Sequence, residues 1–84
     1  MVKPAKLYEL LLQSSSRSIA YRDFEKLVIA FGFSFVRMNG SHAIYTHPKL
    51  PRPFPIQPEG KDAKRYQVRE LLELVEHYAL TLSV

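Results

Sequence analysis

The sequence predicts a small α+β protein in which a three-stranded antiparallel sheet carries its helices on one face. Three observations lead to this class. Apolar residues recur at helical spacing near both ends of the chain, whereas two β-prone runs in the middle flank an Asn-Gly pair. Five of the six prolines then fall between residues 48 and 58, where they limit any further strand.

The helices are expected at residues 3–13, 21–31 and 64–80. In the first, Pro4 suits the opening turn, the leucines at 7, 10 and 11 form a stripe, and the serines at 14–16 end the helix. The second should end at Gly32, which readily adopts a left-handed conformation. The last has the longest helical pattern, and its apolar positions are Val68, Leu71, Leu72, Val75, Tyr78, Ala79 and Leu82.

Strands are expected at residues 33–38 and 41–47, joined by a tight turn at Asn39-Gly40. This register pairs Arg37 with His42 and Phe35 with Ile44, and so places all four on one face. Val36, Met38, Ala43 and Tyr45 occupy the other face. Alternation alone leaves open which face the helices cover. A third strand, near residues 53–57, must be short and lie at an edge because of its prolines.

Composition limits the classes of function. The 84 residues form one domain, and the absence of cysteine excludes disulfides and thiolate metal sites. No apolar stretch is long enough to span a membrane, and we expect a cytoplasmic protein. The formal charge of +4 and the pI near 9.6 suit a polyanionic partner such as nucleic acid.

His42 is the main candidate for chemistry. Near the tip of a hairpin, an imidazole can reach a large substrate while the strand ladder holds its position, as acid/base catalysis near neutral pH requires. The alternative is a histidine that merely decorates a strand. His47 is expected to cap a strand end, and His77 to lie on the surface of the last helix. No Asp, Glu and His cluster has the spacing of a metal site, so no metal or other cofactor is expected.

The element order resembles that of the HicA family of bacterial toxins, together with Phe31-Gly32-Phe33, Val36-Arg37, Gly40-Ser41-His42 and Ile44-Tyr45. The resemblance runs from about residue 21 to residue 80. It divides the chain into an N-terminal helical extension, residues 1–18, and a HicA-like domain, residues 19–84. It implies a fold similar to double-stranded-RNA-binding domains, mRNA cleavage, and silencing by a HicB antitoxin.

On this resemblance, His42 matches the histidine held responsible for RNA cleavage, and Gly40 and Ser41 match the turn that presents it. Arg37 is expected to supply positive charge near the phosphate, and the alternative is that it is only a solvated residue of the strand. The chain departs from the family at two points. Many members carry a second histidine after the third strand, where this chain reads Pro55-Ile56-Gln57-Pro58-Glu59, and the residue after the motif histidine is often polar but here is Ala43. Without the second histidine, activity can be slow or lost. The alternative is that His47, at the end of the second strand, compensates for it, although we expect His47 to cap the strand end.

Lys61, Lys64 and Arg65 precede or open the last helix, where free backbone donors already favour phosphate. They resemble the phosphate-binding lysines of double-stranded-RNA-binding domains, although basic loop residues are often simply solvated. The resemblance to the HicA family implies a ribonuclease toxin that acts on mRNA, and the lack of a metal-site spacing leads us to expect that the cleavage is metal-independent. The alternative is a non-catalytic RNA-binding or protein-interaction module with the same fold.

Overall fold

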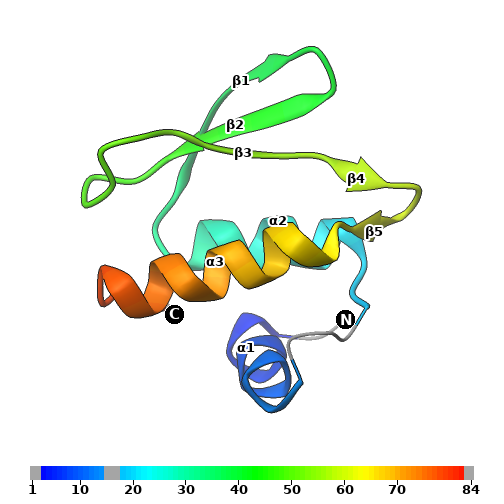
Figure 1. Cartoon of the computed structure of the whole chain (residues 1–84), viewed down its shortest axis with the longest axis vertical. Coiled ribbons are helices and arrows are strands. Elements are labelled where there is room, and N and C mark those ends of the chain that lie inside the picture. The colour runs from blue at the N-terminus through cyan, green and yellow to red at the C-terminus, as the bar shows by residue number, and fades with distance from the viewer. Residues whose placement is uncertain (1–2, 15–17, 83–84) are drawn as a thin grey trace.

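A computed structural model of the chain describes residues 3–14 and 18–82. In chain order the elements are α1 (Pro4–Gln13), α2 (Tyr21–Ala30), β1 (Ser34–Asn39), β2 (His42–Thr46), β3 (Phe54–Ile56), β4 (Pro58–Glu59), β5 (Asp62–Ala63) and α3 (Arg65–His77). Strands β1, β2 and β3 form an antiparallel sheet in that order, and β4 pairs with β5 separately. Helices α2 and α3 cover one face of the sheet, which confirms the predicted class (Figure 1).

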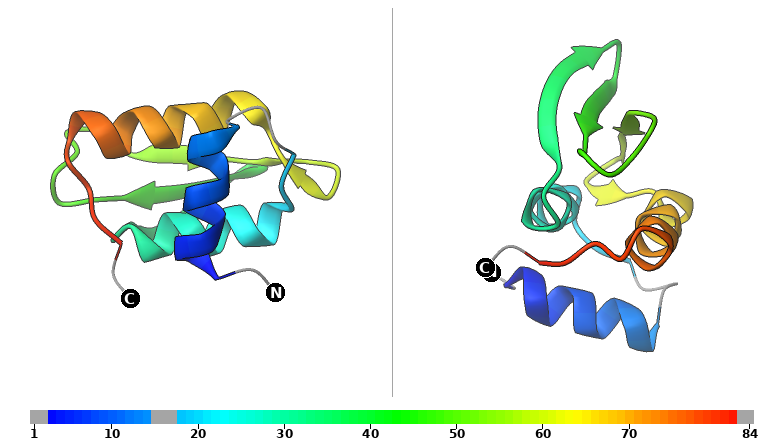
Figure 2. Two further views of the ribbon diagram at one scale, coloured as in Figure 1. Left: turned by 90° about the horizontal axis from the view of Figure 1, so that it is seen from below. Right: turned by 90° about the vertical axis from the view of Figure 1, so that its left-hand side faces the viewer.

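Helix α1 forms a third layer on the far side of α2 and α3, which it crosses (Figure 2). Pro4 occupies its first turn, as predicted, and Ser14 caps its C-terminus. The other two serines predicted to end this helix, Ser15 and Ser16, lie outside the described residues. Leu7 and Leu11 are buried in the same core cluster as the side chains of α2 and α3.

Helix α2 is one residue shorter than expected, because Phe31 is its C-cap. Gly32 follows with a φ of +96°, the left-handed conformation that the sequence predicted for it. The chain then enters Phe33, which is buried beneath the sheet. This sharp exit turns the chain from the helical layer toward β1.

Helix α3 ends at His77, whereas the apolar pattern predicted that it would reach residue 80. The amide of Leu80 donates to the carbonyl of Val75 (2.9 Å), and the amide of Ala79 donates to that of Glu76 (3.4 Å). These bonds form a Schellman motif, with Ala79 in the left-handed position at a φ of +53°. The motif folds Leu80 back into the core, so its apolar character fits the pattern although the helix has ended.

The helices cover the face of the sheet that carries Ala43 and Tyr45. Both belong to the core cluster with Phe54 and Ile56, their partners on β3. As predicted, the third strand is short and lies at an edge. Residues 42, 44 and 46 of β2 must therefore point to the helix-free face, since side chains alternate along a strand.

The predicted hairpin register is wrong. Asn39 is the last residue of β1 and lies opposite His42, so the two-residue turn is Gly40-Ser41. Gly40 has a φ of +63°, whereas neither Asn39 nor Ser41 has a positive φ. A turn with glycine at its first central position satisfies the strand twist without a left-handed asparagine. As a result Arg37 lies opposite Ile44 and not His42.

A β-bulge changes the other predicted pair. The register shifts between Phe35 and Arg37, which leaves Val36 as the extra residue of β1. Phe35 therefore lies opposite Tyr45, on the face of the sheet that the helices cover, and not opposite Ile44. The Phe35 and Tyr45 rings meet edge to face with centroids 5.7 Å apart.

The β4–β5 hairpin has no counterpart in the predicted elements. Its strands have two residues each and turn at Gly60-Lys61, so they carry no readable alternation. Backbone hydrogen bonds connect it to the start of α2: the amide of Tyr21 donates to the Lys61 carbonyl, and that of Ala63 to the Ile19 carbonyl, both at 2.9 Å. Among the described residues, no helix combines the length and apolarity needed to cross a membrane.

Candidate active site

His42 is the first residue of β2 and directly follows the Gly40-Ser41 turn. Its side chain is half-buried and lies on the helix-free face, because Ala43 beside it points into the core. Gly40 and Ser41 are exposed, and a Cβ atom at Gly40 would meet no atom within 4 Å. The turn is therefore open to solvent.

Arg37 and Asn39 flank His42 across the strand pair. Asn39 is directly opposite, whereas Arg37 lies one diagonal position away, and both are exposed on the same face as His42. Diagonal neighbours remain within reach of a long side chain. The predicted direct pair is therefore absent, but the guanidinium and the imidazole still share one face.

The His47 ring contacts backbone groups and has a structural role. Its Nε2 lies 3.0 Å from the Phe31 carbonyl oxygen, and its Nδ1 accepts a hydrogen bond from the Lys49 amide at 3.0 Å. Its ring also meets the Phe33 ring edge to face, at 5.0 Å between centroids. With Nδ1 as an acceptor, Nε2 must carry the proton and donate to the carbonyl. Both ring nitrogens thus bind backbone, in line with the expected capping role.

His77 and His42 lie at different places in the fold, His77 at the end of a helix and His42 at the start of a strand. His77 is exposed at the end of α3, and its ring packs edge to face on Tyr78. The ring of His42 makes no hydrogen bond to any residue within 3–14 or 18–82. His42 and His77 therefore both have rings without a hydrogen bond to the described residues, and of these two only His42 lies on the sheet beside the hairpin turn.

The cations before α3 form two groups. Lys64 and Arg65 border one hollow with Arg69, which also holds the carboxylates of Glu59 and Asp62. Lys61 borders a separate hollow with Tyr21 and Arg22. The structure thus brings together two of the three predicted phosphate-binding residues and adds Arg69.

This cationic region lies at the same end of the molecule as the hairpin turn. Ala43 pairs with Ile56, so the start of β2 lies beside the end of β3, and β4 and β5 then lead to the start of α3. Figure 1 shows the β1–β2 turn and the β4–β5 hairpin projecting toward the same end. Within the described ranges, no group of three or more His, Asp or Glu residues could hold a metal ion.

Over residues 21–76 the sequence matches the family model of the HicA toxin of bacterial toxin–antitoxin systems. The chain belongs to the HicA toxin family. It is therefore the toxin of a toxin–antitoxin pair, as the resemblance implied. No curated protein and no solved structure gives a significant match.

The match to the HicA family begins with α2 and ends within α3, so it includes the hairpin and the residues before α3. It does not include α1. The extension that the sequence analysis separated from the HicA-like domain thus lies outside the part of the chain that the family model describes.

Sequence reasoning missed two residues of this HicA toxin, one opposite His42 and one at the end of β3. Asn39 was assigned to the turn, but the structure makes it the cross-strand neighbour of His42. Gln67 was not singled out, yet it is only 3 % exposed, and its Oε1 accepts a hydrogen bond from the Gln57 amide at 3.1 Å. This bond anchors the end of β3 to α3, and a polar residue inside an apolar helical stripe was the available signal.

A buried phenol connects the sheet to α2. The Tyr45 hydroxyl donates to Oε2 of Glu25 at 3.2 Å. Burial, and then the nearby Glu25 carboxylate, raise the pKa of Tyr45 to about 12. Burial and the same carboxylate also raise the pKa of Tyr21. Because Tyr45 belongs to the core face, this pair holds the hairpin to the helical layer and does not face the candidate site.

Proposed function

We propose that this HicA toxin is an mRNA interferase that cleaves RNA with His42 and without a metal ion. The observation that carries the proposal is the position of the His42 ring, which lies beside the solvent-exposed Gly40-Ser41 turn on the helix-free face and makes no hydrogen bond to the described residues. Both ring nitrogens of His47 are engaged, and His77, which also lacks a hydrogen bond, lies at the end of α3.

In the proposed reaction, neutral His42 accepts the proton of a ribose 2′-hydroxyl. The 2′-oxygen then forms a bond to the adjacent phosphorus, and the bond from phosphorus to the 5′-oxygen breaks. The leaving oxygen takes a proton from water, because no second histidine lies on this face of the described chain. Arg37 offsets the negative charge that develops on the phosphate, and the Gly40-Ser41 turn leaves room for the RNA backbone.

The cations before α3 would bind the RNA outside the reacting bond. Lys61, Lys64 and Arg65 contribute phosphate contacts that do not depend on sequence, and Arg69 extends the group that contains Lys64 and Arg65. Their position at the same end as the hairpin turn allows one RNA strand to contact both. The carboxylates in the same hollow would limit this attraction.

We further propose that the antitoxin is a HicB-like acidic protein that covers His42. Positive charge that attracts RNA also attracts an acidic protein, so the two should compete for the hairpin turn. On this view the toxin acts on mRNA in the cytoplasm and is inactive in the complex. The division into an extension at residues 1–18 and a HicA-like domain at residues 19–84 is part of the same proposal.

The test compares three chains: wild type, His42→Ala and His77→Ala. Expression of wild type should arrest growth and degrade transcripts, and His42→Ala should abolish both, whereas His77→Ala should keep both. Purified wild type should cleave RNA in a chelator and leave DNA of the same sequence intact, since the reaction needs a 2′-hydroxyl. Full toxicity of His42→Ala, or cleavage that requires added magnesium, would contradict the proposal.

The alternative function is a non-catalytic RNA-binding module, which the missing second histidine favours. It predicts that wild type and His42→Ala bind RNA equally and that neither cuts it. For the antitoxin, the product of the adjacent gene should copurify with the toxin, and the complex should leave RNA uncut. A fully active complex, or an interface remote from residues 40–42, would argue against steric inhibition.

A further inference from the structure

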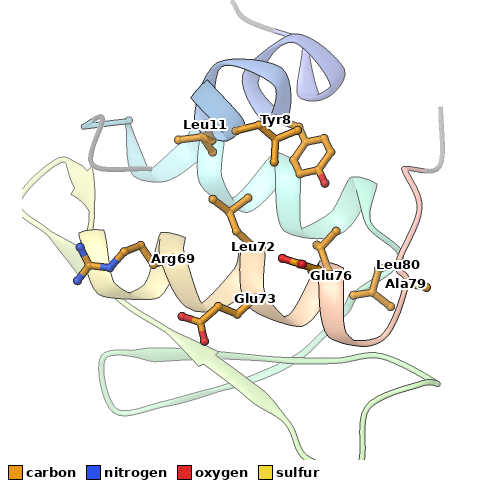
Figure 3. Close-up of a pocket in the computed structure, with 10 residues that line it drawn as sticks. Tyr8, Leu11, Arg69, Leu72, Glu73, Glu76, Ala79 and Leu80 are labelled. Atoms are coloured by element: carbon orange, nitrogen blue, oxygen red, sulfur yellow. The ribbon is translucent and has the colours of Figure 1, made fainter. Parts of the chain in front are cut away.

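Helices α1 and α3 enclose an apolar groove on the side of the molecule opposite the sheet. The groove is lined by Tyr8, Leu11, Leu12, Arg69, Leu72, Glu73, Val75, Glu76, Ala79 and Leu80. Figure 3 shows Tyr8 and Leu11 of α1 and Leu72 of α3 pointing toward one another across the space. Leu12 also lines the groove and is 62 % exposed, the highest value among the large apolar side chains described.

The groove depends on α1, which the family match leaves out. Leu11 is fully buried and holds α1 against the rest of the core, while Leu12 remains in water one position further along the same helix. Removing apolar surface such as that of Leu12 from water favours binding of an apolar side chain. The added helix thus creates an apolar surface that a chain spanning only residues 21–76 would lack.

The charge around the groove is negative. Two carboxylates, Glu73 and Glu76, and one cation, Arg69, are the charged residues among those that line it. Neither Glu73 nor Glu76 forms an ion pair within the described ranges. In Figure 3 the Glu76 carboxylate lies near the middle of the groove, and the Arg69 guanidinium points away from it.

We propose that this groove binds a basic amphipathic helix of a partner protein. A helix that fits between two helices can place an apolar stripe against Tyr8, Leu12 and Leu72. Lysine or arginine on its flank then pairs with Glu73 and Glu76. RNA does not fit this surface, because the carboxylates repel phosphate. The site is therefore separate from the proposed RNA surface and independent of the proposed cleavage.

The probe for the test is a synthetic 14-residue helix made only of leucine and lysine in an amphipathic pattern. It is titrated into the isotope-labelled full chain, and amide chemical shifts are followed by NMR. The proposal expects saturable changes in α1 and in the second half of α3, with β1 and β2 unchanged. A peptide with every lysine replaced by glutamate should not bind.

Two variants examine the contacts separately. Glu73→Gln with Glu76→Gln should weaken binding roughly tenfold and reduce its dependence on salt, because each exposed ion pair contributes at most a few-fold in affinity. Leu12→Ala should weaken it several-fold through lost apolar contact. Glu70→Gln is the matched control, since Glu70 is exposed on the same helix but does not line the groove, and it should bind like wild type.

Three results would overturn the proposal. One is that the shift changes map to the sheet or are spread over the surface. Another is that the double variant binds the lysine peptide as tightly as the Glu70→Gln control does. The third is that the same groove residues shift when the protein is concentrated without peptide, which would make a second copy of the chain the occupant. None of these results depends on whether the chain cleaves RNA.

Discussion

His47→Ala should destabilise the fold strongly, in contrast to the same change at His42. Nε2 of His47 donates to the Phe31 carbonyl and Nδ1 accepts from the Lys49 amide, each at 3.0 Å. A Cβ atom built at Gly32 would come within 3.0 Å of Nε2, so the ring lies close against the end of α2. The His47 ring therefore holds the end of β2 to the exit of α2.

The expected loss follows from these contacts. Each hydrogen bond contributes about 1 kcal/mol, and an edge-to-face ring contact such as that with Phe33 contributes roughly 0.5–1.5 kcal/mol. His47→Ala should therefore lower the free energy of unfolding by about 3 kcal/mol, or the melting temperature by about 12–24 °C in a domain of this size. His42→Ala removes no hydrogen bond within the described chain and should cost less than about 0.5 kcal/mol.

Urea unfolding followed by circular dichroism measures both variants, with His77→Ala as the exposed control. His47→Asn should recover about 1 kcal/mol, because its amide oxygen can take the place of Nδ1 and accept from the Lys49 amide. If His47→Ala costs less than about 1 kcal/mol, or if His42→Ala costs as much as His47→Ala, the division between a structural and a free histidine is wrong.

Three further predictions concern other parts of the chain. Ala79→Gly should stabilise the fold by about 1 kcal/mol in urea unfolding, because glycine adopts the left-handed position of the Schellman motif without strain; a loss of stability would refute this. The pKa of Tyr45, raised to about 12 from 10.0, means that its contribution is present below about pH 10 and is lost as the pH rises toward 12. The stability of wild type relative to Tyr45→Phe should then fall by up to about 2 kcal/mol over that interval, and a constant difference would exclude the effect. Replacing Lys61, Lys64 and Arg65 by glutamine should weaken RNA binding across sequences and flatten its salt dependence, whereas unchanged affinity at low salt would remove them from the RNA surface.

The helices and the sheet could be predicted because apolar residues recur along each of them at a regular spacing. This spacing arises because one side of each element is buried in the core. Phe24, Leu27 and Val28 follow helical spacing and are fully buried, so the pattern and the core coincide. The end of α3 lacked such a signal. Leu80 continues the apolar pattern into the core after the helix has ended, and an alanine, not a glycine, occupies the left-handed position. The β4–β5 hairpin, at two residues a strand, has no pattern at all.

The sequence predicted that Arg37 and His42 share one face of the sheet, although it left open which face the helices cover and paired the two residues wrongly. The shared face was right because the error in the register is an even number of residues. Moving the turn from Asn39-Gly40 to Gly40-Ser41 changes the partner of Arg37 from His42 to Ile44, a shift of two residues. Because side chains alternate with a period of two, this shift leaves every residue on its predicted face. The bulge at Val36 adds a single residue, so Phe35, beyond it, moves to the opposite face.

Arg37 and Asn39 lie between the bulge and the turn, and His42 lies opposite Asn39 just after the turn. The alternation of apolar and polar residues along a strand cannot reveal such a bulge. A single unpaired residue interrupts this alternation and leaves no pattern of its own. Phe35 and Val36 are both apolar and both more than 45 % exposed, so burial does not mark the interruption either. The bulge instead separates two functions of β1. On its tip side the strand presents polar groups beside His42, and on its other side Phe35 packs on Tyr45 and so helps to fix the base of the hairpin.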